Sequence, residues 1–402
     1  MGVDEIEQLS ELVGGLLGSP LPESDEGLCD RLVGVHRLQA RLGALKAKVM
    51  AAADARRAYA ADGSKTVGAW LARACHASPA VVRAEARLGR RLRTMPVSMG
   101  ALSGGEIGRE HVEVLARVAH SPRVVLVAAF PGAEEMLVGF ARDLSFEDFV
   151  RAVNHWINVV DPDGSEGDAE RSFEQRRVHL SQTLDGAWVL DGRFDAISGT
   201  IVDTALRRIE QDLFQDEWTA ARAANGGQDP TNDQLSRSPA QRRADALVEM
   251  AKRAMAMPKG ARKPRPLVTV VVGLDTLAGR ICELFNKMPV APGQVARLLD
   301  EALVERVVFD SPSRVIDLGT QERFFRGGLR RAIEIRDRHC QWPGCTQPAD
   351  DCQVDHIQPH SWGGQTDQTN GRLLCAHHNR WRANSGKPQP QPQPHPPDEA
   401  AA

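Results

Sequence analysis

The sequence predicts a mainly α-helical protein with small β elements, built from a large helical body followed by a small module at residues 321–386. Three observations support this. Apolar residues recur at helical spacing through most of residues 26–320, strand-like segments interrupt them in only a few places, and Cys, His, Asp and Asn residues cluster between positions 340 and 379. At 402 residues the chain exceeds a typical single domain, so two folding units are expected.

The first predicted long helix follows a polar start. Residues 1–25 are acidic and rich in Ser, Gly and Pro, which favours a flexible N-terminal segment with one short helix. From Cys29 to Ala61, apolar residues repeat every three or four positions, and Asp62-Gly63 is expected to end the helix. The stripe predicted to be buried comprises Leu32, Val33, Val35, Leu38, Leu42, Leu45 and Val49.

Residues 66–95 predict two helices joined by a short turn. The first runs from Val67 to Cys75, and Pro79, behind a Ser78 N-cap, opens a second that ends at Arg93. This second helix carries Arg83, Arg87, Arg90, Arg91 and Arg93. The pattern fits a helix-turn-helix that approaches DNA, but an ordinary helical hairpin with a solvated arginine face is more common, so the sequence favours the hairpin and leaves DNA binding open.

Later elements complete the helical body at residues 26–320. Helices are expected at about 105–120, 132–142, 145–160, 197–214, 242–256 and 296–307. Asp185-Gly186 between alternating segments predicts a β-hairpin near residues 177–190. Strands are expected at 267–272 and 314–318, followed by the module at 321–386, and residues 387–402 predict a disordered tail rich in Pro and Gln.

Composition restricts the class of protein. The apolar fraction of 42% and charged fraction of 26% are ordinary for a soluble protein. The sequence has no uninterrupted apolar run of about 18 residues, so insertion into a membrane is not expected. The acidic N-terminal sequence lacks the features of a secretory signal, so a cytoplasmic location is expected. In that reducing compartment, seven cysteines argue against a disulfide framework, and clustered Cys and His argue for a metal site.

Two pairs of metal ligands lie in the module. Cys340 and Cys345 bracket a short Gln-Trp-Pro-Gly turn, and Cys375 and His378 stand three positions apart. Three thiolates and one imidazole match tetrahedral Zn²⁺, and a site with all four positions filled is structural. Because a module of about 60 residues has little core of its own, zinc is expected to contribute to its folding.

The residues between these pairs carry a specific resemblance. Cys340-x4-Cys345, Asp355-His356-Ile357-x-Pro359, Gly363-Gly364, Asn370 and Leu374-Cys375-x-x-His378-Asn379 together resemble the HNH endonuclease family over residues 329–383. The resemblance implies a ββα-metal fold that binds one catalytic divalent ion and hydrolyses phosphodiester bonds, with double-stranded DNA as the expected partner.

The resemblance also implies roles for individual residues. His356 matches the general base that activates water, Asp355 the ligand of the catalytic metal, and Asn370 the asparagine that steadies the hairpin and aims the base. Asn379 stands where the family usually has its last histidine. An amide oxygen remains a competent ligand for Mg²⁺ or Mn²⁺, so Asn379 is expected to be the second ligand.

Some choices stay open at this level. Ligand spacing favours His378 over His377 on the zinc, but a shift by one residue would exchange them. Four arginines near the motif are candidate phosphate contacts, although solvated surface charge explains any one of them equally well: Arg338, Arg372, Arg380 and Arg382. Residues 321–387 hold ten Lys or Arg and seven Asp or Glu, a modest positive excess that suits a polyanionic partner.

The helical body carries a looser resemblance. Trp70-Leu71, Gly105-x-Ile107-x-x-x-His111 and Arg242-Arg-Ala-Asp-Ala-Leu247 resemble a helical domain of unknown function that often precedes HNH modules in actinobacterial proteins. The favoured hypothesis is therefore a metal-dependent DNA endonuclease. The alternative is a non-catalytic DNA-binding or regulatory protein with a degenerate, zinc-stabilised HNH module. The adjacent Asp355 and His356 favour the enzyme, and no feature of the sequence indicates an oligomeric state.

Overall fold

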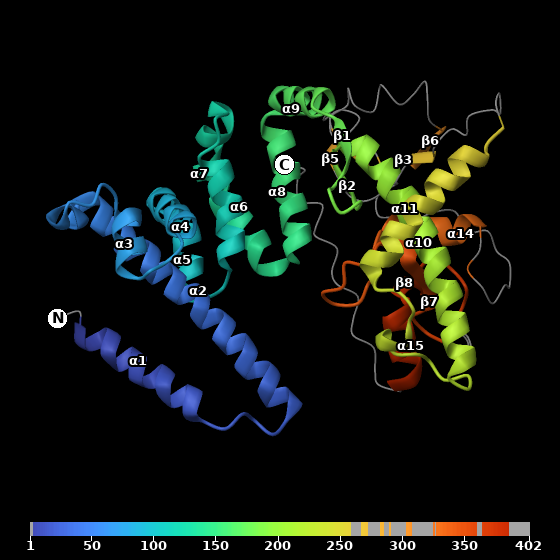
Figure 1. Ribbon diagram of the computed structural model, residues 1–402, viewed down its shortest axis with the longest axis horizontal. Coiled ribbons are helices and arrows are strands. Elements are labelled where there is room, and N and C mark those ends of the chain that lie inside the picture. Colours follow the sequence, from blue (N-terminus) through green and yellow to red (C-terminus); the bar gives the residue numbers. More distant parts are fainter. Residues whose placement is uncertain are drawn as a thin grey trace. The chain divides into compact units, whose positions relative to one another are not determined.

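The computed structural model describes residues 3–258, 267–271, 282–284, 289–290, 303–307, 325, 327–359 and 364–385. The chain divides into two compact units, Met1–Val153 and Asn154–Ala402. Helices make up most of the residues that the structure describes, and the strands are short (Figure 1), which confirms the predicted mainly α fold with small β elements.

The N-terminal unit is formed by helices. Helix α1 lies within the segment predicted to be flexible, and nearly all of its described side chains are exposed. The helices that follow enclose a core in which Val112, Leu115, Leu137 and Val138 are completely buried. The elements are α1 (Val3–Gly18), α2 (Asp25–Arg56), η1 (Ala58–Asp62), α3 (Val67–Ala74), α4 (Pro79–Leu92), α5 (Pro96–Gly104), α6 (Arg109–Ala119), α7 (Val124–Asp143) and the start of α8 (Phe146–Val160).

Helix α2 buries a different face from the one predicted. The Leu and Val stripe from Leu32 to Val49 is exposed, and the buried residues are Ala40, Ala44, Ala47 and Met50. The reason is close helix packing: a Cβ atom on Gly89 of α4 would lie only 2.9 Å from the carbonyl oxygen of Ala47. Alanine and glycine permit this approach, whereas Leu and Val at the contact would hold the two helices apart.

Among the described helices, only α7 is long and apolar enough to cross a membrane by length and composition, a criterion that core helices of soluble proteins also meet. In this unit α7 packs against α5 and α6. Its buried Glu134 accepts hydrogen bonds from the backbone nitrogen of Ser98 at 2.8 Å and from the Ser98 hydroxyl at 2.7 Å. These bonds pair the carboxylate with the first turn of α5 inside the helical core.

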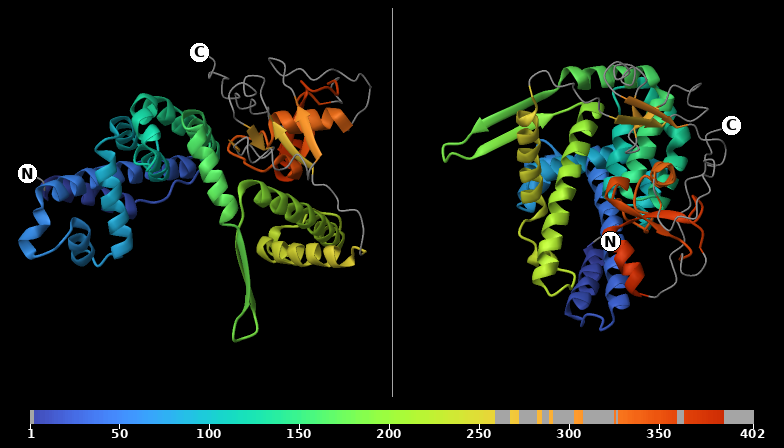
Figure 2. Two further views of the ribbon diagram at one scale, coloured as in Figure 1. Left: turned by 90° about the horizontal axis from the view of Figure 1, so that it is seen from above. Right: turned by 90° about the vertical axis from the view of Figure 1, so that its right-hand side faces the viewer.

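The second unit begins with helices and a β-hairpin. Strands β1 (Arg177–Gln182) and β2 (Trp188–Arg193) pair as predicted, and Gly186 in the turn has φ +86°, a conformation that favours glycine. Every residue of both strands is exposed, and the hairpin extends away from the helices on either side of it (Figure 2). Those helices are α9 (Pro162–Glu174), α10 (Ala196–Ala224) and, after η2 (Asn232–Gln234), α11 (Pro239–Ala256).

A small mixed sheet corrects one predicted helix. Its strands are β3 (Leu267–Val271), β4 (Cys282–Leu284), β5 (Pro289–Val290) and β6 (Leu303–Val307), in the order β5-β4-β3-β6. Residues 303–307, predicted as the end of a helix, pair in parallel with β3, and this distant partner is invisible to a local periodicity. The strand predicted at 314–318 and the tail at 387–402 lie outside the described residues.

The module near the end of the chain has the expected ββα order. Helix α14 (Gly327–Asp337) and η3 (Ala349–Asp351) precede the antiparallel strands β7 (Cys352–His356) and β8 (Gly371–Cys375), and α15 (Ala376–Ser385) follows directly. Its core joins Phe325, Ile333, Leu373 and Leu374 to three buried cysteines. Two of the predicted metal ligands, Cys340 and Cys375, therefore belong to the core of the module.

Candidate metal centre and active site

The four predicted zinc ligands converge in the structure. One ligand atom each from Cys340, Cys345, Cys375 and His378 lies within 4.8 Å of the others. His378 enters the cluster through Nδ1, which is 3.4 Å from Cys340 Sγ and 3.2 Å from Cys375 Sγ. His377 is exposed and outside the group, so the geometry selects His378 from the two adjacent histidines.

Local structure explains how the two pairs meet. Gly344, with φ +74°, lets the chain turn between Cys340 and Cys345. Cys375 ends β8 and His378 lies in the first turn of α15, so one strand-to-helix junction supplies both residues. The Trp342 ring stacks on the His378 ring at 4.8 Å with an interplanar angle of 6°, which limits rotation of the imidazole.

The thiols are crowded in a way that a cation would relieve. A hydrogen bond with Cys352 and burial raise the pKa of Cys340 to about 12. The pKa of Cys375 is raised as well, chiefly by its hydrogen bond with Cys340 and then by burial. A bound divalent ion reverses this preference because it stabilises thiolates, so the donor set fits Zn²⁺. Cys352 is buried beside the cluster but is not among its four members.

Asp355 lies close to two arginines at the end of β7. Its Oδ1 accepts a hydrogen bond from Arg382 on α15, and its Oδ2 is 3.5 Å from Nε of Arg372 on β8. Oδ2 is buried and has no hydrogen-bond partner among the described residues. Burial raises the pKa of Asp355 more than Arg382 and Arg372 lower it. A buried carboxylate oxygen with spare acceptor capacity is suited to a hard cation.

His356 follows Asp355 but contacts other elements, because successive side chains of a strand point to opposite faces. Its Nε2 is 2.9 Å from the Thr366 hydroxyl, and its ring is 4.5 Å from that of Phe325. Across the hairpin it pairs with Gly371, where a Cβ would lie 2.4 Å from Ile333 Cδ1. Glycine at this position therefore lets the core approach the strand beneath the histidine.

Asn370 closes the loop between β7 and β8. Its Oδ1 accepts a hydrogen bond from the backbone nitrogen of Gln358 at 2.8 Å, and its Nδ2 donates to the carbonyl oxygens of Gln358 at 3.1 Å and Gln365 at 2.6 Å. A Cβ on Gly364 would lie 1.9 Å from the Gln358 oxygen, so the loop requires glycine there. One amide side chain thus holds together the two ends of the segment that follows His356.

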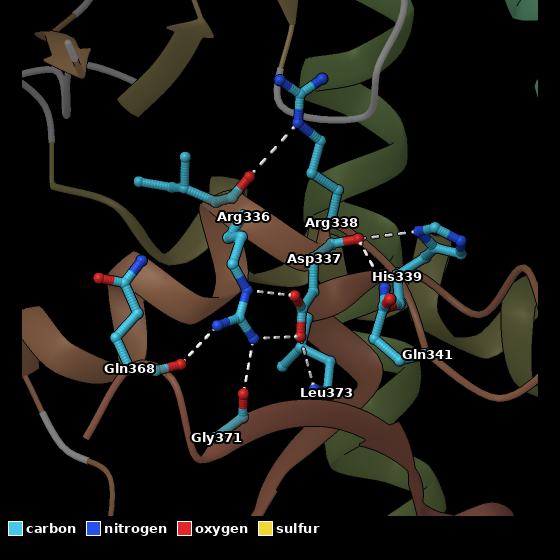
Figure 3. Close-up of polar contacts among 9 residues, drawn as sticks. Arg336, Asp337, Arg338, His339, Gln341, Gln368, Gly371 and Leu373 are labelled. Atoms are coloured by element: carbon cyan, nitrogen blue, oxygen red, sulfur yellow. Dashed lines mark hydrogen bonds and ion pairs between the residues drawn. The ribbon is translucent and has the colours of Figure 1, made fainter. Parts of the chain in front are cut away.

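An ion pair that the sequence did not predict joins α14 to this loop (Figure 3). Asp337 is only 2% exposed, and its Oδ2 accepts a hydrogen bond from the backbone nitrogen of Leu373 at 2.8 Å. Arg336 donates to both Asp337 oxygens, to the Gly371 carbonyl at 2.6 Å and to the Gln368 carbonyl. The pair therefore holds the loop before Gly371 and the strand after it. An adjacent Arg and Asp at a helix end carry no local signal of burial.

The other predicted residues occupy separate positions. The Asn379 amide donates a hydrogen bond to Gln353 Oε1 at 2.6 Å, one turn of α15 before Arg382. Arg338, with φ +59°, follows α14 and donates to the Ile335 carbonyl at 3.3 Å, and Arg380 lies 4.2 Å above the Trp218 ring of α10. Arg372 is 3% exposed, a position that suits an internal counter-charge better than contact with a phosphate backbone.

The chain is similar to known families and proteins. Residues 31–337 match the model for "Domain of unknown function (DUF222)", and residues 338–383 match that for "HNH endonuclease". Relatives include uncharacterized protein MT1183 of Mycobacterium tuberculosis (strain CDC 1551 / Oshkosh), 24% identical over 286 residues, and uncharacterized protein Rv1148c of Mycobacterium tuberculosis (strain ATCC 25618 / H37Rv), 26% identical over 294 residues.

Each of these matches covers 69% of this chain and 62% of the relative, so the chain spans less than two thirds of the length of these relatives. No solved structure matches the chain. The first family model covers more than half of the chain, and the second coincides with the cluster of Cys340, Cys345, Cys375 and His378 and with the Asp355–His356 pair. The chain therefore belongs to the DUF222 family and carries an HNH endonuclease domain at residues 338–383.

Proposed function

We propose that the chain is a metal-dependent endonuclease that hydrolyses phosphodiester bonds of double-stranded DNA, with His356 as the general base. The observation that carries this proposal is the state of Asp355: a carboxylate 10% exposed, with one oxygen that lacks a hydrogen-bond partner among the described residues, directly before a histidine at a strand end. Arg382 and Arg372 lie beside this charge, and the oxygen without a hydrogen bond is a position that a hard cation could occupy.

The residues around His356 suit proton transfer. The imidazole accepts a proton from water through one ring nitrogen, while contacts of the ring with Thr366 and Phe325 hold its orientation. Asn370 supports the same geometry from the loop, because its three side-chain hydrogen bonds tie together the segment after the histidine. The roles of His356 as base and Asn370 as positioning residue are part of the proposal.

Two metal sites would complete the module. Cys340, Cys345, Cys375 and His378 would hold Zn²⁺, whereas Asp355 and Asn379 would hold Mg²⁺ or Mn²⁺ on the side of β7 that contacts α15. When bound there, Mg²⁺ or Mn²⁺ supplies Lewis-acid stabilisation of charge on the scissile phosphate. Arg382, which donates to Asp355, would then be available to a phosphate oxygen.

A second function has a specific observation in its favour. The Asn379 amide nitrogen donates to Gln353 and Asp355 Oδ1 accepts from Arg382, so both residues proposed to bind the catalytic ion already make hydrogen bonds within the protein. A non-catalytic DNA-binding or regulatory protein would need only the zinc cluster and the fold it stabilises. In that case the module would bind DNA without cutting it.

Plasmid nicking separates the two functions. The zinc-loaded protein is incubated with supercoiled plasmid and either Mg²⁺, Mn²⁺ or no added ion, and the nicked and linear products are quantified. The enzyme proposal expects nicking that depends on the added ion and is lost in Asp355→Asn. His377, which is exposed and adjacent to the proposed zinc ligand His378, provides a matched control. The His377→Ala variant should nick plasmid as the wild type does. Plasmid binding without nicking under any ion would support the regulatory function instead.

Arg382→Gln is expected to tighten Mn²⁺ binding about tenfold. Arg382 and a divalent cation would compete for the charge of the same Asp355 carboxylate, and a charge-assisted hydrogen bond of about 1.5 kcal/mol corresponds to roughly a tenfold change in affinity. Loss of the electron paramagnetic resonance signal of free Mn²⁺ measures the affinity without reference to cleavage. Arg380→Gln, which removes a charge that lies over Trp218, should leave the affinity unchanged. Unchanged or weaker binding in Arg382→Gln would contradict the competition.

A further inference from the structure

Helices α3 and α4 of the N-terminal unit are joined by a tight four-residue turn. The turn comprises Cys75 to Ser78, and His76 within it has φ +51°, in the left-handed region. The backbone nitrogen of Ala77 donates to the Ala72 carbonyl at 3.0 Å and closes the end of α3. The Ser78 side chain makes no capping bond, contrary to prediction, and Pro79 alone sets the start of α4.

The two helices pack closely against each other and against α2. Val67 and Ala72 of α3, Val82 and Ala86 of α4, and Met50 of α2 form one buried cluster. At Gly68 a Cβ would lie 3.7 Å from Arg83 Cα, so the first helix approaches the backbone of the second. This packing fixes which face of α4 is directed away from the core.

The outer face of α4 carries a row of arginines. Arg83, Arg87 and Arg90 are four and three positions apart, which places them on one side of the helix, and all three are exposed. Arg90 is 3.1 Å from Asp54, whereas no ion pair within the described parts of the chain involves Arg83 or Arg87. The single acidic residue of α4, Glu85, is paired with Lys46 at 2.8 Å. The charged residues that α4 itself contributes to this face are therefore all arginines, of which Arg90 is paired with Asp54 of α2.

We propose that α3 and α4 form a helix-turn-helix whose second helix enters the major groove of double-stranded DNA. An α-helix with its side chains is about 10–12 Å across, and the major groove is about 12 Å wide, so the 14-residue helix α4 fits into the groove. Ala80 and Ala84, three positions before Arg83 and Arg87, are small enough to let the helix approach base edges closely. In this geometry α3 crosses the phosphate backbone while the arginines of α4 contact phosphates and bases.

A duplex fits this surface better than an acidic protein does. The arginines stand on a rigid helix at fixed spacing, and exposed Ala80, three positions before Arg83, offers an apolar contact of the kind that a thymine methyl group accepts. The inference is independent of the proposed nuclease, because it concerns binding by the N-terminal unit and needs neither Asp355 nor His356. It assigns DNA recognition to a part of the chain for which the family match states no function.

The test measures DNA binding by the full, zinc-loaded chain without added Mg²⁺ or Mn²⁺. Fluorescence anisotropy with a labelled 20-base-pair duplex, between about 50 and 200 mM salt, compares the wild type with the double substitution Arg83→Ala and Arg87→Ala. Affinity should fall about 10- to 100-fold, and the slope of log affinity against log salt should become shallower by about 2. Arg117→Ala removes an exposed arginine of α6 as a control. The slope of log affinity against log salt should then change by no more than about 1, the value for one phosphate contact.

The outcomes distinguish this inference from the nuclease proposal. Circular dichroism must show the wild-type helix content, which is expected because both side chains are exposed. Wild-type affinity and slope in the double variant would overturn the inference, even if the protein nicks plasmid. A double variant that loses affinity for a single strand of the same sequence as much as for the duplex would also overturn the inference. Docking in the major groove requires a greater loss of affinity for the duplex. Loss of duplex binding without any nicking by the wild type would support the helix-turn-helix and contradict only the proposed nuclease.

Discussion

Cys375→Ser is expected to release zinc and unfold the module at residues 327–385. Cys375 supplies one of four ligand atoms, and its backbone nitrogen also donates to Cys340 Sγ at 3.3 Å, so one substitution disrupts the cluster from two sides. Structural zinc contributes about 10–16 kcal/mol to folding in small zinc domains, comparable to the whole stability of an ordinary domain. Metal content per chain and limited proteolysis at 25 °C measure the loss, and chelation of zinc from the wild type should produce the same cleavage pattern.

Two matched pairs identify the ligands. Cys352→Ser alters a buried thiol beside the cluster and should retain one zinc per chain, in contrast to Cys375→Ser. His377→Ala should likewise retain zinc, whereas His378→Ala should lose it. If Cys352→Ser or His377→Ala proves to be the variant that loses the metal, the ligand set proposed for the site is wrong.

His356→Ala is expected to reduce the rate of ion-dependent nicking by about 10² to 10⁴-fold, the usual contribution of a positioned general base. The imidazole packs on Phe325 and pairs with Thr366, so its removal also leaves a small gap in the loop region. Zinc content and circular dichroism establish that the module remains folded. Mn²⁺ affinity should stay near the wild-type value, because the proposed ion is held by Asp355 and Asn379.

Two results of this experiment would contradict the role proposed for His356 or the validity of the assay. His356→Ala that nicks plasmid at the wild-type rate, with wild-type zinc content, would remove His356 from the mechanism and leave Asp355 without its partner base. An equal loss of nicking in His377→Ala, which alters an exposed histidine of α15, would show that the assay responds to general damage of the module.

The metal cluster was predictable from sequence because its signal is local. Cys340 with Cys345 and Cys375 with His378 form two short-range pairs, and a turn or a helix start brings each pair together almost regardless of the remaining fold. The choice between His377 and His378 depended on which side of α15 faces the sulfur atoms. Spacing favoured His378, and the helix geometry places it in the cluster.

The surroundings of the proposed active site were not predictable in this way. Arg372 resembled a surface phosphate contact, but pairing of β7 with β8 places it opposite Asp355 inside the module. Asp337 and Arg336 gave no signal, because their importance arises from backbone groups of residues 368–373, more than thirty positions away. Long-range hydrogen bonds of this kind leave no periodicity in the sequence.

By itself, the sequence determined the mainly α fold, the β1–β2 hairpin and the ligand quartet, because each depends on residue type and short-range spacing. The order of the ββα module followed from the resemblance of its motifs to the HNH family. Only the tertiary structure decided which face of α2 is buried, that residues 303–307 form a strand, and that Arg372 and Arg382 flank Asp355. The physical reason is the same in each case. Close packing and strand pairing select among locally acceptable alternatives through partners that lie far away in the chain.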